Sequence, residues 1–418
     1  MDETQSLETG HSGSVEGRAG KRAEENTRDP APQPPPKRLR QSLEDTPVDK
    51  GDPYYPIELW AREGSWPREY LEEPSIIELT LVRKPPLAPI RRVQSWSDSA
   101  TSATPSDRRP REEKSAPYED TGYETLLASH GSFMAESLEG VTDSTKAAVR
   151  SMLEKPQPLP EYSIFDDSTF KAACRNLQGR NEARVIQDIS WLIVPSAEIL
   201  AVGGAKHLKI LAESVNAGWN NSIPLTGIIR PQPDYSVGFS REAFTEGQLA
   251  NLSPFIGDFL GDDLSLFMAT YYMYFPFLAS EVKCGATSLD VADRQNAHSM
   301  TLAVRGVVAL FRIVNREEEV NRQILAWSIS HDHRSVRIYG YYPVIDDEGS
   351  IQYYRHPIRA YDFTELDGKE KWTAYRFTRN IYDTWMPDHF KRICSVINQL
   401  PSNMDIDVPV PSESTSTP

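Results

Sequence analysis

The sequence of 418 residues contains only three cysteines, Cys174, Cys284 and Cys394. They are far apart and odd in number, which excludes a disulfide framework and a Cys-x-x-Cys metal site. No secretory signal peptide opens the sequence, and no apolar run approaches the length of a membrane span. These absences predict an intracellular protein that has no membrane partner.

Several catalytic motifs are missing as well. The sequence has no Gly-rich loop that would cradle phosphates, no Gly-x-Ser-x-Gly elbow and no internal repeat of fixed period. Positive charge is scarce, because 45 Lys and Arg stand against 60 Asp and Glu, and the net charge is −15. Coating of nucleic acid through bulk charge is therefore excluded, whereas an enzyme with a local basic rim is not.

The composition divides the chain into three parts. Residues 1–155 are rich in Ser, Thr, Pro, Glu and Arg, which predicts a disordered arm. Residues 156–402 carry dense, periodic aliphatic and aromatic side chains and predict the folded domain, and residues 403–418 predict a second disordered tail. Within the arm, residues 54–73 form an aromatic island. This island is interpreted as a short docking motif, a strap on the domain, or a stretch without a role.

A short basic cluster follows a proline run in the arm. It consists of Lys37, Arg38 and Arg40. Clusters of this kind act as nuclear-import signals, although they also arise by chance in disordered tails. The sequence therefore predicts entry into the nucleus.

The folded part contains an acid and a base inside an apolar, strand-like run. In Phe-Pro-Phe-Leu-Ala-Ser-Glu-Val-Lys-Cys, Glu281 and Lys283 are two residues apart, so a strand directs both to one face. Asp234 follows a proline and starts another strand-like segment upstream. Two carboxylates can hold a divalent cation such as Mg²⁺ (or Mn²⁺), and the amine can position the attacking water. These residue types predict phosphodiester cleavage.

This order of residues resembles the PD-(D/E)xK superfamily of restriction-endonuclease-like nucleases. The resemblance implies that Asp234 and Glu281 are metal ligands and that Lys283 is the catalytic lysine. It adds Glu182 as a further metal ligand from the preceding helix and Gln295 as a catalytic residue on the following helix. Residues from about 233 to 400 are also similar to an uncharacterised fungal family that is grouped with this superfamily.

The same residues have a structural interpretation. Glu281 and Lys283 can form a buried ion pair in an ordinary α/β domain, because buried charges are kept when they are paired. Glu182 can simply stabilise a helix N-terminus. Two further alternatives stay open, namely a catalytically silent binding module with the nuclease fold and a regulatory or effector-like protein whose arm carries the function.

The expected fold is a three-layer, restriction-endonuclease-like α/β domain, with a mixed central sheet of about five or six strands flanked by helices. A long helix is expected to start at Thr287-Ser-Leu-Asp290, which is a capping-box-like sequence. Helices are predicted at 167–177, 182–192, 205–217, within 242–259 and at 287–314, and strands at 223–229, 234–239, 267–274, up to 283, 323–330 and 336–344.

The expected partner is DNA or RNA. Its backbone contacts are sought among cations on two C-terminal helical stretches, which also carry aromatic residues. The candidate cations are Lys369, Lys371, Arg376 and Arg379. Aromatic residues at helical spacing are more often core residues than stacking platforms, so the cations are assigned only to the phosphate backbone.

Overall fold

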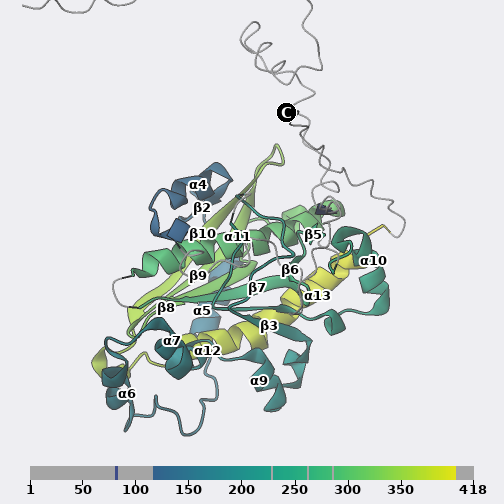
Figure 1. Cartoon of the computed structure of the whole chain (residues 1–418). Helices are drawn as coiled ribbons and strands as arrows, with labels where there is room; N and C mark the ends of the chain where they lie inside the picture. The colour runs from purple at the N-terminus through teal and green to yellow at the C-terminus, as the bar shows by residue number, and fades with distance from the viewer. Residues whose placement is uncertain (1–80, 83–115, 227–228, 261–262, 285–286, 402–418) are drawn as a thin grey trace, which may run out of the picture. The chain divides into compact units, whose positions relative to one another are not determined.

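The computed structural model describes residues 81–82, 116–226, 229–260, 263–284 and 287–401 (Figure 1). The aromatic island, the basic cluster and the predicted tail at 403–418 lie outside these residues. The described residues all belong to one compact unit, Glu73–Pro418.

The described chain is built around a mixed sheet of eight strands. Seven of them follow the order β2-β10-β9-β8-β7-β4-β3, and β6 pairs with β7. The β7/β8 and β2/β10 pairs are parallel, and the other pairs are antiparallel. The strands are β2 (Ser132–Phe133), β3 (Leu211–Val215), β4 (Tyr235–Phe239), β6 (Met268–Thr270), β7 (Met273–Val282), β8 (Ala326–His331), β9 (Ser335–Ile345) and β10 (Ile351–Asp362). The prediction of an α/β domain with a mixed sheet and helices is confirmed.

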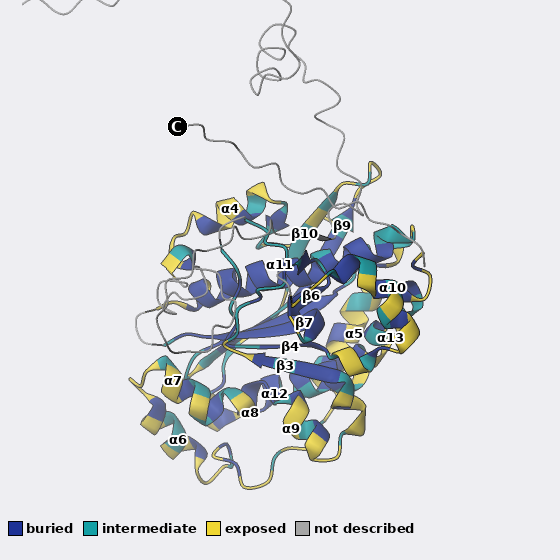
Figure 2. Ribbon diagram, turned by 45° about the vertical axis from the view of Figure 1, so that its right-hand side comes forward, coloured by how far each residue is buried: buried dark blue, intermediate teal, exposed yellow. Residues whose placement is uncertain are grey.

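The central strand β7 explains why the sheet needs cover on both sides. All ten of its residues are buried, and strands covered on both faces read as continuous apolar runs. Figure 2 shows β7, β4 and β3 buried between helices. Glu281 and Lys283, the acid and base of the candidate site, therefore lie at the end of a strand that is buried along its whole length.

Helix α11 (Leu289–Ile313) covers one face of the sheet. The Ser288 hydroxyl accepts a hydrogen bond from the Asp290 amide at 3.1 Å and caps this helix, one residue after Thr287, where the predicted capping-box sequence begins. The helix packs tightly at Gly306, where an added Cβ would lie 2.3 Å from the Leu266 carbonyl oxygen. Only glycine allows the helix to pack this deeply at that point.

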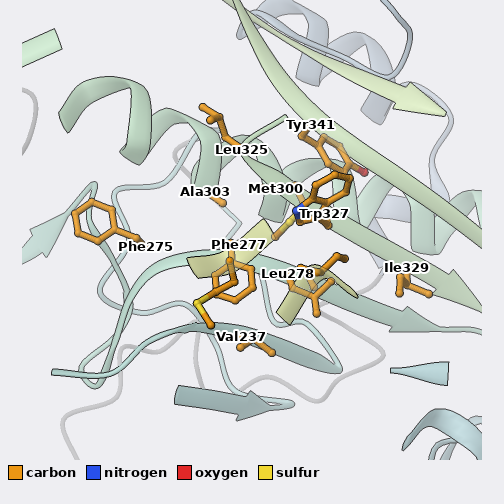
Figure 3. Close-up of a cluster of buried hydrophobic side chains, with 14 of the residues drawn as sticks. Val237, Phe275, Phe277, Leu278, Met300, Ala303, Leu325, Trp327, Ile329 and Tyr341 are labelled. Carbon is orange, nitrogen blue, oxygen red and sulfur yellow. The ribbon is translucent and has the colours of Figure 1, made fainter. Parts of the chain in front are cut away.

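Alternate residues of β8 show that the opposite face has its own layer. Ser330 points to α11, because the Asn296 amide donates to its hydroxyl at 3.0 Å. Trp327, three residues earlier, instead packs edge-on against Phe377 and Trp385. These two belong to α12 (Thr373–Asn380) and to the π-helical turn η8 (Ile381–Trp385), which is followed by α13 (Met386–Ile397). Figure 3 shows the apolar side chains that fill the layers around β7.

The predicted limit of the arm at residue 155 is wrong for residues 116–155. They form α4 (Tyr123–Ser129), β2 and α5 (Asp143–Glu154). Leu127 and Val141 are fully buried, and Met152 is 2 % exposed. The composition of this stretch is polar, but single apolar side chains at helical spacing pack on the sheet, and a compositional average hides them. The domain therefore includes at least 40 residues that precede its predicted start.

Other differences concern the edges of the sheet. The helix predicted at 205–217 is a 3-10 turn, η4 (Lys206–Ile210), followed by the edge strand β3. The described residues of the strand predicted at 223–229 are not in a strand. β10 was not predicted, because its twelve residues mix charges, tyrosines and a proline without apolar alternation.

The predicted insertion between Asp234 and Glu281 is confirmed in outline. It contains η5 (Arg241–Ala243) and α10 (Glu246–Ile256), the latter with a Thr245–Gln248 capping box. β5 (Leu264–Ser265) and β6 follow, and β5 pairs with β1 (Leu81–Val82). The insertion leaves the β4/β7 pairing intact and lies away from the end of β7 that carries Glu281.

His389 on α13 gives a test of the core that does not depend on function. It is 3 % exposed, its ring stacks on Trp385 at 4.3 Å, and burial lowers its pKa to about 3. The unfolded chain takes up a proton near the ordinary pKa of 6.5 and the folded chain does not, so folding stability is lost as the pH falls from about 6.5 toward 3.

His389→Phe is therefore expected to reduce the slope of unfolding free energy against pH by up to about 1.4 kcal/mol per pH unit in this window. Urea unfolding at several pH values measures this slope. His130→Gln, which changes an exposed histidine at the end of α4, serves as the control. An unchanged slope in His389→Phe would show that this imidazole is not held neutral.

Candidate active site

The pairing of β4 with β7 brings Asp234 next to Glu281. Tyr235 is paired with Ser280, and the same antiparallel register places Asp234, one residue earlier, opposite Glu281. The Asp234 Oδ2 atom accepts a hydrogen bond from the Val282 amide at 2.8 Å. Asp234 is 5 % exposed and Glu281 is 1 % exposed. Two carboxylates that are 47 positions apart in the sequence thus lie on neighbouring strands at one end of the sheet.

Lys283 extends this pair. Its Nζ atom lies 3.9 Å from Glu281 Oε2 and donates to the Val282 carbonyl at 2.9 Å. Its backbone amide donates to the His331 carbonyl at 3.1 Å and continues the β7/β8 ladder. Lys283 is 4 % exposed. A buried ammonium group is kept when carboxylates and carbonyls surround it, and Lys283 satisfies this condition.

Glu182 joins the group from a separate helix. Its Oε2 atom is 3.8 Å from Lys283 Nζ, and its side chain is 28 % exposed. It opens α7 (Glu182–Val185), which runs on through the π-helical turn η3 (Ile186–Ser190) into α8 (Trp191–Ile193). Asn181 starts this helix, because its Oδ1 atom accepts from the Arg184 amide at 3.1 Å. Glu182 is thus the solvent-facing member of the group, and Asp234, Glu281 and Lys283 are the buried members.

Gln295 and His298 lie on α11. Gln295 is 8 % exposed, and its buried Oε1 atom has no hydrogen-bond partner within the described part of the chain. His298 is fully buried and bonds through Nδ1 to the hydroxyls of Tyr118 at 2.9 Å and Tyr123 at 3.0 Å. Burial lowers the pKa of His298 to about 3, so the ring is neutral near pH 7. The catalytic role predicted for Gln295 stays a prediction.

The two tyrosines were not found by sequence reasoning. They lie on or just before α4, in the stretch that was predicted to be disordered. Burial, followed by Tyr123 and Glu281 as further causes, raises the pKa of Tyr118 well above its usual value. Tyr118 therefore remains a hydroxyl and experiences the charge of the Glu281 carboxylate. Only the aromatic spacing of Tyr118 and Tyr123 in the sequence hinted at a packed segment.

Cys284 follows Lys283 directly and is half-buried. Burial, with Glu182 and Asp332 as further causes, raises the pKa of its thiol to about 11. A nucleophilic or metal-binding cysteine works as a thiolate. Cys284 therefore remains a thiol near pH 7 and does not supply a nucleophile to the group.

The described residues contain no group of three or more His, Cys, Asp or Glu side chains placed to hold a metal ion. Mg²⁺ differs from most metals in this respect, because one or two carboxylates together with waters and substrate phosphates suffice for it. Asp234 and Glu281 are carboxylates on adjacent strands, and this donor chemistry fits Mg²⁺ rather than a thiolate-seeking metal.

The cations predicted to contact nucleic acid differ in their surroundings. Lys369 is exposed and Arg376 is half-buried. Lys371 is 7 % exposed and forms an ion pair with Asp167. Arg379 is 3.4 Å from Asp383. Lys371 and Arg379 are thus each paired with a carboxylate, and the contacts of the four cations with a nucleic-acid backbone stay a prediction.

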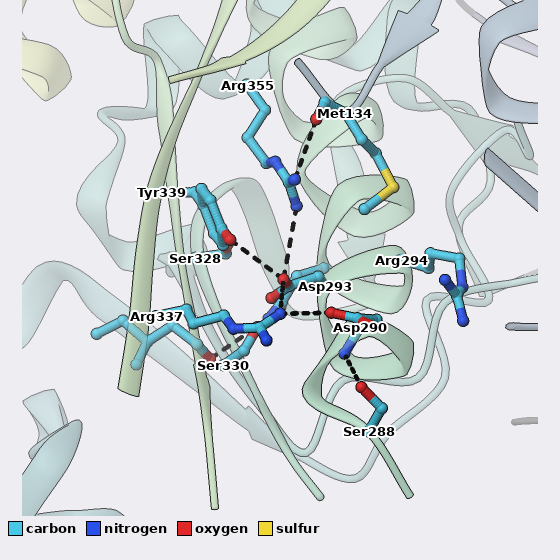
Figure 4. Close-up of polar contacts among 12 residues, drawn as sticks. Met134, Ser288, Asp290, Asp293, Arg294, Ser328, Ser330, Arg337, Tyr339 and Arg355 are labelled. Atoms are coloured by element: carbon cyan, nitrogen blue, oxygen red, sulfur yellow. Dashed lines mark hydrogen bonds and ion pairs between the residues drawn. The ribbon is translucent and has the colours of Figure 1, made fainter. Parts of the chain in front are cut away.

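A second buried polar group lies beside the site on the α11 face (Figure 4). Asp293 on α11 accepts hydrogen bonds from Arg337 at 2.7 Å and from the Tyr339 hydroxyl at 3.2 Å. Arg355 stacks over the Tyr339 ring, with its guanidinium carbon 4.0 Å from the ring centroid, and lies 3.8 Å from Asp293. This network connects α11 to β9 and β10. Within it, Asp293 is paired with both Arg337 and Arg355.

Within the described ranges, no helix is long and apolar enough to cross a membrane.

Comparison with known proteins yields a family but no activity. No curated protein matches the chain. One family model covers residues 169–397, a range that contains Glu182, Asp234, Glu281, Lys283 and Gln295 and excludes Tyr118 and Tyr123. The match spans more than half of the 418 residues, so the chain belongs to the family described as a domain of unknown function, DUF7924.

Proposed function

We propose that this protein is a metal-dependent nuclease of the PD-(D/E)xK type, which hydrolyses phosphodiester bonds of DNA or RNA. The observation that carries the proposal is the group at the end of β7. Asp234 and Glu281 lie on adjacent strands, and the Lys283 ammonium lies within 4 Å of Glu281, at the end of an otherwise apolar strand. Charged side chains that are this deeply buried are rare in proteins unless they are paired with one another or hold a metal ion.

Asp234 and Glu281 would hold Mg²⁺ (or Mn²⁺), and Glu182 would contribute a third carboxylate from the solvent side. The ion, when bound, acts as a Lewis acid on the phosphoryl oxygen and lowers the pKa of water. The Val282 amide orients the Asp234 carboxylate through the 2.8 Å hydrogen bond. This fixed geometry favours binding, because a preorganised ligand loses little freedom.

Lys283 would act directly on the reacting atoms. Its ammonium group can hold the attacking water and stabilise the negative charge that develops on the phosphoryl oxygens. Attack forms a bond between the water oxygen and phosphorus, and the bond to the leaving sugar oxygen breaks. The attacking water gives up a proton to solvent, and the leaving oxygen takes up one from solvent. The Gln295 amide is proposed to assist by hydrogen bonding, since its buried Oε1 atom has no partner among the described residues.

A catalytically silent binding module is the second candidate. It is favoured by one observation, which is that Lys283 lies between two carboxylates, 3.8 Å from Glu182 and 3.9 Å from Glu281, as a structural ion pair would. Such a pair needs no metal. Whether the protein is a nuclease or a silent binding module, we propose that it enters the nucleus through the basic cluster Lys37, Arg38 and Arg40.

Incubation of the purified full-length protein with labelled DNA and RNA separates the two functions. The nuclease is expected to shorten at least one of them in Mg²⁺ or Mn²⁺ and to stop when EDTA is added. Saturating metal should also raise the melting temperature, because a ligand that binds only the folded state stabilises it by about 2.7 kcal/mol at 100 times its Kd. Intact substrates together with an unchanged melting temperature would favour the silent module.

A further inference from the structure

A basic segment stands beside Glu182 in a protein that is acidic overall. Between residues 170 and 184 there are four cations and a single carboxylate, whereas the whole chain has a net charge of −15. The four cations are Lys171, Arg175, Arg180 and Arg184, and the carboxylate is Glu182. The segment comprises α6 (Phe170–Leu177), the turn after it and α7. Local charge of this kind can attract an anionic ligand although the net charge repels it.

The turn between α6 and α7 borders a hollow of about 730 Å³ that is open to solvent. Its lining is polar and consists of Asn176, Gly179, Arg180, Asn181 and Arg184. All five are exposed, and Figure 2 shows the outer sides of α6 and α7 facing solvent. Gly179 has a φ of +70°, and no atom lies within 4 Å of the position that a Cβ would take there. The backbone is thus open to a ligand at this point.

The two arginines of the hollow are held by single contacts at Nε. Arg180 Nε donates to the Asn176 carbonyl at 3.1 Å, and Arg184 Nε lies 2.8 Å from Asp188 Oδ2. No carboxylate is paired with Arg180 in the described ranges. A guanidinium carries five N–H donors in a fixed fork that matches phosphate. Arg180 is therefore the guanidinium best placed to bind a phosphate oxygen, and Arg184, held by Asp188, adds a second cation beside it.

The hollow adjoins the proposed catalytic group through α7. Asn181 lines the hollow and precedes Glu182, whose carboxylate is 3.8 Å from Lys283 Nζ. A nucleic-acid strand that places one phosphate at Lys283 continues along its backbone with further phosphates on either side. The same short helix therefore presents a carboxylate to the reacting phosphate and arginines to the flanking backbone.

We propose that the hollow formed by Arg180, Arg184, Asn176 and Asn181 binds a backbone phosphate next to the phosphodiester that is cleaved. The choice of ligand rests on the nuclease function proposed above. Contacts to phosphate position a nucleic acid without reading its sequence. The hollow therefore supplies affinity and register.

Binding without cleavage tests this site. Fluorescence anisotropy of short labelled DNA and RNA oligonucleotides is measured in EDTA with the full-length protein, over a range of salt concentrations. Arg180→Ala/Arg184→Ala is expected to weaken binding about tenfold at low to moderate salt and to lower the slope of log K against log salt by about 2. Arg150→Ala/Arg241→Ala, which removes two exposed arginines that lie outside the basic segment and do not line the hollow, should bind like the wild type.

The outcomes are distinct from those of the nuclease test. An unchanged affinity and salt slope in Arg180→Ala/Arg184→Ala, or an equal loss in the control variant, overturns the phosphate site even if the wild type cleaves. Absence of any binding by the wild type overturns it as well. Loss of binding in this variant alone supports the site, and it does so even if the wild type fails to cleave, in which case only the nuclease function falls. The DNA and RNA arms identify which polymer is preferred.

Discussion

Asp234→Asn is expected to abolish cleavage of nucleic acid and to leave the fold as stable as that of the wild type. The asparagine oxygen can still accept the hydrogen bond from the Val282 amide that Asp234 accepts at 2.8 Å. The negative charge is lost, and with it the affinity for Mg²⁺. Several kcal/mol of transition-state stabilisation by the metal correspond to a loss of about 10³-fold in kcat/KM. Cleavage rates and melting temperatures, each with and without Mg²⁺, measure both effects.

Asp346→Asn is the matched control. Asp346 stands in the β9–β10 turn and also accepts backbone amides, from Glu348 at 3.0 Å and from Ser350 at 2.8 Å. Its amide variant should cleave like the wild type. If Asp234→Asn retains full activity, or if it loses stability while Mg²⁺ has no effect on either protein, the carboxylate is not a metal ligand.

Lys283→Met is expected to have the largest effect on stability. Glu281 is 1 % exposed, and this change removes the ammonium group that lies 3.9 Å from it. Loss of one partner from a buried ion pair costs about 3 to 5 kcal/mol, because the remaining charge stays out of water. Urea unfolding of the apo protein measures this loss, and the cleavage assay is expected to show no activity.

A second change separates charge from packing in this experiment. Lys283→Met/Glu281→Gln removes both charges and should regain a large part of the lost unfolding free energy. Lys146→Met is the control, because Lys146 and Asp143 form a surface pair that is worth less than about 1 kcal/mol. If Lys283→Met is as mild as this control, the electrostatic account of the site is wrong. Severe destabilisation with no response of the wild type to Mg²⁺ would favour the structural ion pair.

The centre of the fold was predictable from the sequence, whereas its edges were not. Glu281 and Lys283 stand in a run whose apolar residues must be buried. The sequence therefore predicted both the strand and a candidate site at its end. The long helix that begins after Ser288 carries a capping residue and a continuous apolar stripe. β10 and β3 lack such patterns, because β3 is an edge strand and β10 is paired on its outer side only with the two residues of β2. Strands that are covered so little tolerate charges and tyrosines.

The candidate site shows the same division. Asp234, Glu281 and Lys283 were chosen from their residue types and order, and the structure brings them together across two strands. His331, at the end of β8, was not among the predicted site residues, but it is fully buried and bonds to Ser190 at 3.0 Å. Its partner lies 141 positions away. Contacts between residues so far apart in the sequence depend on the tertiary structure, and a local sequence pattern does not predict them.

The contact of α4 with His298 bears on where the molecule can be divided. The region shared with the family starts at residue 169, yet both hydroxyl partners of His298 and the strand that covers the edge of β10 come from residues before it. A chain that begins at residue 169 would keep every residue of the proposed catalytic group. It would lose the side chains that cover His298 on α11. The region shared with the family therefore begins later in the sequence than the folded domain does. Recombinant fragments should begin before Tyr118 rather than at residue 169.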